Sequence, residues 1–292
     1  MTIQAISGDR NFLNMIGDGS FHGHVHSVFD HTINIQCALD SSLYSVAARR
    51  SDNAPNTIVI DTDCFAGLDI AQDSKVISGQ TALEIAGCLS ISARHACTWS
   101  GKLEIKLADL SSLKGNLAVA RAYLDRYGIP GGMKPQTEGT DFQKAMSLML
   151  ASGSSAVIDA LAERKIEQAL EHAGKLLGLG PGLTPSGDDF LTGCLAVLSS
   201  VTATKKEFAA FCNGVEQAAR RSTNLISYAA LSKAARGEMR ATIADLIKDL
   251  CCGQESSLEE ALTKTVMIGS SSGTDIAWGV VRSLELLLET GE

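Results

Sequence analysis

The residues best suited to chemistry lie in one Gly-rich segment, which spans residues 178–193 and reads GLGPGLTPSGDDFLTG. Five glycines and two prolines in these sixteen positions predict a fixed, non-helical turn after an amphipathic helix over 155–177. Glycines let backbone N–H groups approach a ligand without Cβ clashes, and the start of the next helix adds positive potential. This chemistry suits a phosphate, a carboxylate or a carbamoyl group. The candidate binding residues here are Gly180, Gly182, Thr184, Ser186 and Gly187.

Two adjacent aspartates in this segment are candidate catalytic carboxylates. Ser186 and Asp189 fit a capping box, in which each side chain bonds a backbone N–H at the helix start. Asp188 has no such structural role, so we assign it to a substrate amide, a cation or a proton. A well-capped turn between two helices would also explain part of the pattern, but the density of glycine, proline and hydroxyl residues favours a functional site.

A later segment, SGTDIAWG at 272–279, repeats SGDDFLTG at 186–193 in register. Asp275 corresponds to Asp189 and is the third candidate catalytic carboxylate. Two interpretations stay open: the two helix starts converge on one anion, or the second start repeats good capping chemistry. A third helix start follows a basic pair and would either complete the pocket or serve only as a cap. The further candidate binding residues at these two starts are Ser272, Gly273 and Asn224.

Three histidines, His22, His24 and His26, alternate along a predicted strand and would share one face. Three imidazoles suffice for a catalytic zinc site with water as the fourth ligand, which would make the protein a metal hydrolase. They span about 13 Å, so one metal would reach all three only through a bulge, for example at Gly23. The three candidate aspartates would instead suit Mg²⁺. The sequence firmly implies no cofactor, and we assign no metal ligand.

The composition indicates a cytoplasmic protein with a small-molecule partner. The 292 residues carry a net charge of −8 and a pI near 5.3, which argues against nucleic acid or an anionic membrane as a partner. An anionic substrate would then need a local source of positive charge. Eight cysteines without a CxxC spacing indicate reduced thiols. The sequence has neither signal-peptide features nor an uninterrupted apolar run of about 20 residues.

The elements that must position the site follow two different patterns. Residues 1–108 read as short strands separated by Asp, Asn and Gly, which predicts a β-rich domain, a small barrel or sandwich, with one helix near 82–88. Residues 109–292 change to a helical period and predict a mainly α-helical domain that carries the Gly-rich segment. Residues 131–139 read as a linker or hinge. The expected fold class is α+β.

The core GLTPSGDD, at 182–189, and the late segment SSGTD, at 271–275, resemble the AllH (YlbF-like) family, an uncharacterised bacterial family. The resemblance extends over nearly the whole chain. It implies a subunit of an oxamate carbamoyltransferase in anaerobic allantoin breakdown, a branch of purine catabolism. That reaction exchanges oxalurate and phosphate for oxamate and carbamoyl phosphate. The resemblance also implies FdrA-like proteins as partner subunits.

The residues are compatible with the chemistry that the resemblance implies. Carbamoyl transfer requires positioning and stabilisation of oxyanion charge, which backbone N–H groups at helix starts supply. In this hypothesis, Asp188 orients a carbamoyl amide while the Gly-rich segment cradles its oxygens. The alternative is a non-catalytic ligand-binding or regulatory subunit of an FdrA-like assembly. Such a subunit would bind at the same loop without turnover by the isolated chain.

Overall fold

A computed structural model describes residues 2–107, 110–136, 138–201, 206 and 208–290. The chain divides into two compact units, residues 1–101 and 102–292. The boundary between the units lies seven residues before the one predicted at residue 108. Leu103 and Ile105 are buried in the hydrophobic core of the helical unit, so their segment belongs to that unit. The N–H of Ile105 donates to the Ser200 carbonyl at 2.9 Å. These residues therefore belong to the second unit.

The first unit is a closed barrel of eight strands with one extra strand, which confirms the β-rich prediction and selects the barrel over the sandwich. The strand order is β5-β4-β3-β2-β6-β7-β8-β1, and pairing between β1 and β5 closes the barrel. β9 pairs with the second half of β1. The strands and the one helix of this unit are β1 (Thr2–Asp9), α1 (Arg10–Gly17), β2 (His22–Val28), β3 (Thr32–Cys37), β4 (Leu43–Ala48), β5 (Thr57–Ile60), β6 (Lys75–Gly79), β7 (Ala82–Ile85), β8 (Leu89–Ser92) and β9 (Cys97–Trp99).

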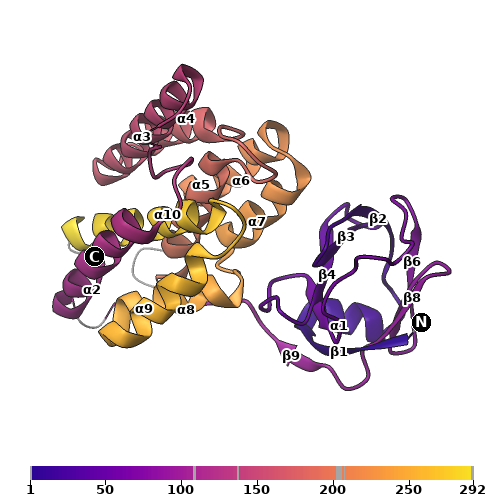
Figure 1. The fold of residues 1–292 in the computed structure, drawn as a ribbon. Coiled ribbons are helices and arrows are strands. Elements are labelled where there is room, and N and C mark those ends of the chain that lie inside the picture. Colours follow the sequence, from indigo (N-terminus) through magenta and orange to yellow (C-terminus); the bar gives the residue numbers. More distant parts are fainter. Residues whose placement is uncertain (1, 108–109, 137, 202–205, 207, 291–292) are drawn as a thin grey trace. The chain divides into compact units, whose positions relative to one another are not determined.

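The helix predicted near residues 82–88 is wrong, because β7 occupies residues 82–85 as a strand. Leu83 and Ile85 are buried and alternate with more exposed neighbours, which is the period of two that a strand requires. The helix of this unit is α1, which lies against the barrel and buries Phe12 and Ile16 (Figure 1). Asp9 caps it, accepting the N–H groups of two residues in its first turn.

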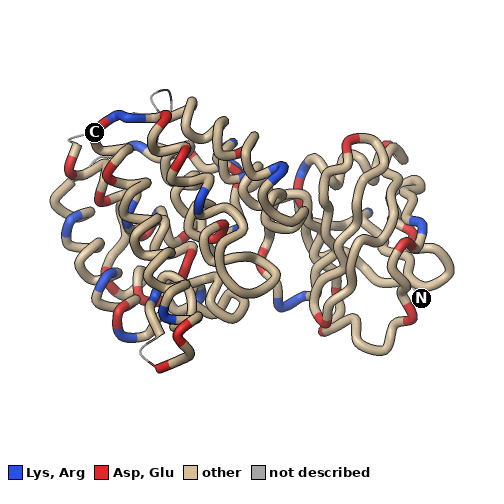
Figure 2. Tube along the Cα trace, turned by 90° about the horizontal axis from the view of Figure 1, so that it is seen from above, with Lys and Arg blue, Asp and Glu red and all other residues tan. Residues whose placement is uncertain are grey.

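The second unit is mainly helical, which confirms the α+β fold class. The single helix predicted over 155–177 is instead interrupted near Arg164, whose φ of 59° no helix accommodates. The helices are α2 (Leu110–Tyr127), α3 (Asp141–Ala162), α4 (Ile166–Leu176), α5 (Ser186–Ser200), α6 (Ala209–Ser222), α7 (Leu225–Ala235), α8 (Ala241–Cys252), α9 (Glu255–Val266) and α10 (Ser272–Thr290). Lys and Arg are interspersed with Asp and Glu along them (Figure 2).

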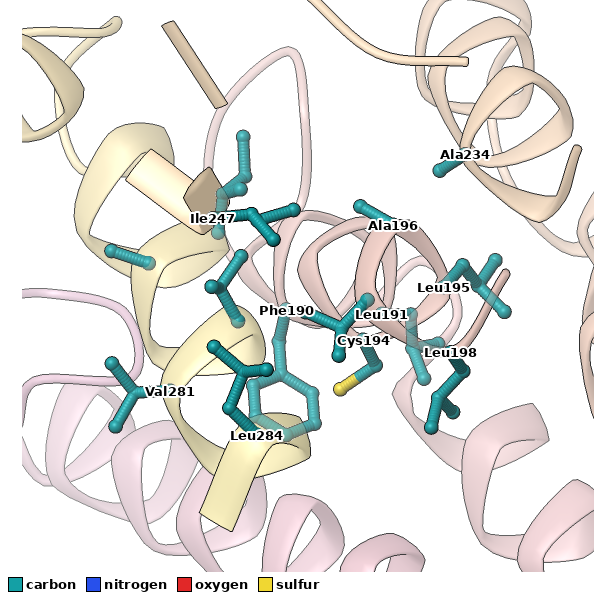
Figure 3. Close-up of a cluster of buried hydrophobic side chains, with 14 of the residues drawn as sticks. Phe190, Leu191, Cys194, Leu195, Ala196, Leu198, Ala234, Ile247, Val281 and Leu284 are labelled. Atoms are coloured by element: carbon teal, nitrogen blue, oxygen red, sulfur yellow. The ribbon is translucent and has the colours of Figure 1, made fainter. Parts of the chain in front are cut away.

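Helix α5 is the central helix of this unit and is buried on nearly all sides. Figure 3 shows its apolar side chains, among them Phe190 and Leu195, surrounded by residues of α7, α8 and α10. α5 crosses α10 closely at two glycines in register. A Cβ at Gly193 would lie 2.1 Å from the Ile276 carbonyl oxygen, and a Cβ at Gly279 would lie 2.1 Å from the Phe190 carbonyl oxygen. The repeated sequence therefore forms the crossing.

Among the described helices, α3 is long and apolar enough to cross a membrane by length and composition. A third of its most apolar window is buried in the unit. Core helices of soluble proteins pass the same test, and Ser147 and Gly153 interrupt the apolar run. The first turns of α3 expose Phe142 and Leu148.

Candidate functional site

The start of α5 differs from the predicted capping box. Pro185 occupies the N-cap position, and no side chain caps the helix. Ser186 is the first helical residue, and its buried hydroxyl makes no hydrogen bond. The N–H of Gly187 donates to the carbonyl of Leu179, 2.9 Å away. The capping box is therefore wrong, because the helix begins one residue earlier and the N–H of Asp189, which Ser186 would have capped, donates to the Pro185 carbonyl at 3.1 Å.

Asp188 has the structural role that the sequence did not reveal. One carboxylate oxygen accepts the N–H of Gly178 at 2.8 Å, and the other accepts the hydroxyl of Thr223. Burial raises the pKa of Asp188, while the bonds from Thr223 and Gly178 oppose the shift. Asp188 thereby fastens the Gly-rich loop and the turn between α6 and α7 to the start of α5.

Asp189 links the loop to the start of α10. Its Oδ2 accepts the hydroxyl of Thr184 at 2.9 Å, and the Thr184 oxygen lies 2.8 Å from Ser272 Oγ. Burial raises the pKa of Asp189 to about 7. Hydroxyl groups of Ser272 and Thr184 lower this pKa, whereas the charges of Asp275 and Asp188 raise it. Asp189 is therefore a buried carboxyl that changes protonation near neutral pH.

Asp275 occupies the corresponding place on α10. Its Oδ1 accepts the N–H of Met133 at 2.6 Å, and its Oδ2 is buried without a hydrogen bond. Burial raises the pKa of Asp275 to about 6, and the Met133 N–H followed by the Ser186 and Ser271 hydroxyls lower it. Ser186 of α5 thus lies beside Asp275 of α10, just as Ser272 of α10 lies beside Asp189 of α5.

The two repeated helix starts therefore lie together. Each start places its serine next to the aspartate of the other. The result is a buried cluster of three carboxylates with hydroxyl neighbours, at one end of the α5–α10 crossing. Asp188, Asp189 and Asp275 are each at most 5% exposed.

The glycines have two different roles. Gly180 and Gly182 have φ values of +121° and +96°, which side chains rarely adopt, so the exposed turn requires them. Gly187 and Gly273 instead allow close approach: a Cβ would lie 2.1 Å from the Leu176 carbonyl oxygen in the first case and 1.8 Å from the Thr265 carbonyl oxygen in the second. The N–H of Gly273 donates to Ile268, as that of Gly187 donates to Leu179.

Asn224 caps α7, accepting the N–H groups of Ile226 and Ser227. Its Nδ2 also donates to the carbonyl of Leu183 in the Gly-rich loop, 2.8 Å away. Asn224 thus connects a third helix start to the loop.

Replacing Asn224 separates these two roles. Asn224→Ala is expected to lower the free energy of unfolding by about 1 kcal/mol through loss of the cap. Asn224→Asp keeps the capping oxygen and loses only the amide donor to Leu183, so stability should change little while amide exchange in the loop quickens. Urea denaturation and hydrogen exchange measure the two effects. Equal stability losses in both variants would contradict the assignment.

A second loop, at residues 128–135, overlaps the linker predicted at 131–139 and packs against the start of α10. Ile129 N–H donates to Thr274 Oγ1 at 2.9 Å, and Met133 N–H donates to Asp275. Gly132 packs directly over the Asp275 carboxylate, because a Cβ there would lie 2.2 Å from Oδ2. The signal that would have found these residues is a Gly/Pro pattern shared with residues 178–185.

The three histidines of β2 do not gather at one point. The pairing of β2 with β3 has an irregularity between Val25 and Ser27, so His26 leaves the alternation of His22 and His24. The ring of His26 contacts the neighbouring Ser27 hydroxyl instead. In the parts of the chain that the structure describes, no three His, Cys, Asp or Glu side chains are placed to hold a metal ion.

Comparison with known proteins covers both units. Residues 176–284, which include both repeated helix starts, match the family model described as oxamate carbamoyltransferase subunit AllH. Residues 4–98, which form the barrel, match the AllH family N-terminal domain. The matched family is named for a carbamoyltransferase subunit, and a subunit implies partner subunits. The chain belongs to the AllH family. No solved structure matches it.

Proposed function

We propose that this chain is the subunit of an oxamate-type carbamoyltransferase that binds the small anionic substrates at the converging starts of α5 and α10. In one direction, the nitrogen of oxamate attacks the carbamoyl carbon of carbamoyl phosphate. The bond from that carbon to the phosphate oxygen breaks, phosphate leaves, and the attacking nitrogen loses a proton. The product is oxalurate. The family name supports the reaction class.

The observation that carries the proposal is the connection of Asp189 to the Gly-rich loop through hydroxyl groups. Thr184 and Ser272 are both partly exposed and lie 2.8 Å apart. Thr184 donates to Asp189, whose pKa of about 7 suits a group that accepts and returns a proton at neutral pH. Asp189 therefore takes the proton of the attacking nitrogen through these hydroxyls.

The other residues position the substrates. Backbone groups of Gly180 and Gly182, with the hydroxyls of Thr184 and Ser272, hold substrate oxygens as negative charge develops. The buried hydroxyl of Ser186 lies behind them, beside Asp275. The remaining candidates do not contact substrate. Asp188, Asp275 and Asn224 anchor the loops through hydrogen bonds. Gly187 and Gly273 permit close packing of the backbone.

Mg²⁺ does not fit this cluster. Asp188 uses both carboxylate oxygens to accept protein donors, and Asp275 uses one for Met133. Within the described residues, no group of three metal-binding side chains is placed around one ion. The cysteines found are all free thiols, in keeping with our proposal of a cytoplasmic reaction in allantoin and purine breakdown.

Turnover tests the proposal. The chain is assayed alone and with its FdrA-like partner subunits, by phosphate release from carbamoyl phosphate and oxamate. Asp189→Asn is expected to lower kcat at least about 100-fold, because a proton acceptor is lost. Thr184→Val should also lower kcat, because the hydroxyl that connects Asp189 to the loop is lost. Ser270→Ala, at an exposed serine of the turn before α10, is the matched control and should keep full activity.

The alternative assignment gives a different result. If the chain is a non-catalytic binding subunit, the assembly keeps its kcat when Asp189 is replaced by asparagine, and only the concentration dependence of the anions changes. Full turnover by an Asp189→Asn assembly would therefore overturn the catalytic assignment.

A further inference from the structure

The loop at residues 128–135 repeats the Gly-rich loop at residues 178–185. The first reads GIPGGMKP and the second reads GLGPGLTP. Both have glycine at the first and fifth positions and proline at the eighth. A large apolar residue occupies the second and sixth positions in each. Lys134 stands where the other loop has Thr184.

The two loops are also fastened in the same way. In the first, Ile129 N–H donates to Thr274 and Met133 N–H donates to Asp275. In the second, Gly178 N–H donates to Asp188, and the Thr184 hydroxyl donates to Asp189. Thr274 and Asp275 correspond to Asp188 and Asp189 in the repeated helix starts. Each helix start thus carries one Gly/Pro loop, held by the same two positions.

Two buried polar groups between these loops lack partners. Ser186 Oγ, from α5, and Asp275 Oδ2, from α10, are inaccessible to solvent and make no hydrogen bond. The two residues lie side by side: the Ser186 hydroxyl is close enough to lower the pKa of Asp275, although the pair does not reach hydrogen-bonding geometry. A buried polar group without a partner costs about 1–3 kcal/mol. A ligand with both donors and acceptors would satisfy the two groups together.

Lys134 is the charged residue of the loop at residues 128–135, two positions after Gly132, which packs over the Asp275 carboxylate. Its backbone follows Met133, which bonds Asp275 directly. The side chain is half-buried, and its Nζ donates to the carbonyl of Arg126 in the last turn of α2 at 3.4 Å. Within the described residues, no carboxylate is paired with it. The ammonium group is thus available to an anion at the cost of one long hydrogen bond.

We infer that residues 128–135 form a second ligand loop, and that Lys134 binds the anionic end of the ligand while residues 178–185 hold its other end. The ligand class is a small anion with an amide or carbonyl group next to its charged group. This inference rests on the proposed function, since both use the cluster of Asp189 and Asp275. It adds the source of positive charge that an acidic chain needs in order to bind an anion.

Calorimetric titration of the full chain with oxamate, and separately with inorganic phosphate, tests the inference. Lys134→Gln is expected to weaken binding of at least one anion tenfold or more, while Lys134→Arg keeps it within about threefold. Lys175→Gln, on the exposed face of α4, removes the same charge elsewhere and should leave affinity unchanged. Tenfold weakening that is confined to Lys134→Gln supports the second loop.

The other outcomes separate failure of this inference from failure of the proposed function. If wild type binds and Lys134→Gln binds within twofold, the inference is overturned and the proposed function stands. If Lys134→Gln only lowers the melting temperature of the ligand-free chain, Lys134 merely caps α2, and the inference is again overturned. If wild type binds neither anion, both the proposed function and the inference fail.

Discussion

Replacing Gly279 by alanine is expected to lower the free energy of unfolding of the helical unit by about 3 kcal/mol. The new Cβ would lie 2.1 Å from the carbonyl oxygen of Phe190 and 3.0 Å from the N–H nitrogen of Cys194, both backbone atoms of α5. Backbone in a buried helix cannot move aside as a flexible side chain can. α5 and α10 must therefore separate, which disturbs the core on both sides of the crossing and the site at its end.

Gly115→Ala is the matched control for this substitution. Gly115 lies within α2 of the same unit, and a Cβ there would meet no atom within 4 Å. Because alanine favours a helix more than glycine does, this variant should gain up to about 1 kcal/mol. Urea denaturation measures both variants. A Gly279→Ala chain as stable as Gly115→Ala would show that the crossing is not tight.

Raising the pH from 5 to 8 is expected to lower the free energy of unfolding by about 2 to 3 kcal/mol through Asp189. The pKa of this carboxyl is about 7 in the folded chain, against an ordinary value of 3.8, because burial disfavours the charged form. Between these two values the folded state binds more protons than the unfolded state. Stability is therefore present at low pH and is lost as the pH rises through about 7.

Asp275 adds a loss of the same sign up to about pH 6, the raised pKa of its own buried carboxyl. Asp189→Asn carries no charge at either pH, so the variant should lose much less stability between pH 5 and 8. Asp125→Asn, at an exposed position of α2, serves as control and should follow wild type. Urea denaturation at the two pH values measures the free energy of unfolding of each variant. Equal losses of this free energy in Asp189→Asn and in wild type would argue against a buried, protonated Asp189.

The sequence pointed to one candidate site because the signal was local. The repeat at 186–193 and 272–279 is visible in one chain, and the structure brings its two copies together at the α5–α10 crossing. The capping box failed because the pattern does not show which residue precedes the helix. With Pro185 at that place, the N–H of Asp189 donates to the Pro185 carbonyl and is not free for the Ser186 hydroxyl.

The roles that depend on distant residues were not predictable. Asp188 accepts from Thr223, which lies 35 positions further along the chain. Alternation identified strands in the first unit, but only the pairing of β1 with β5 distinguishes a barrel from a sandwich. Glycine and proline at residues 131–135 indicate a linker as readily as a binding loop. Thr274 and Asp275, which hold that loop, lie about 140 positions away.

The first strand of the barrel cannot complete its pairings until the last strand of its unit has been synthesised. β1 pairs with β5, β8 and β9, so its last neighbour is residue 99. At about 5–20 residues per second, a ribosome needs roughly 5 to 20 s to release that neighbour after β1 itself has emerged. During this interval the new chain presents unpaired strand edges, which are prone to join other chains. β1 is thus among the last strands of the barrel to reach its final contacts, and its edges stay open to other chains until then.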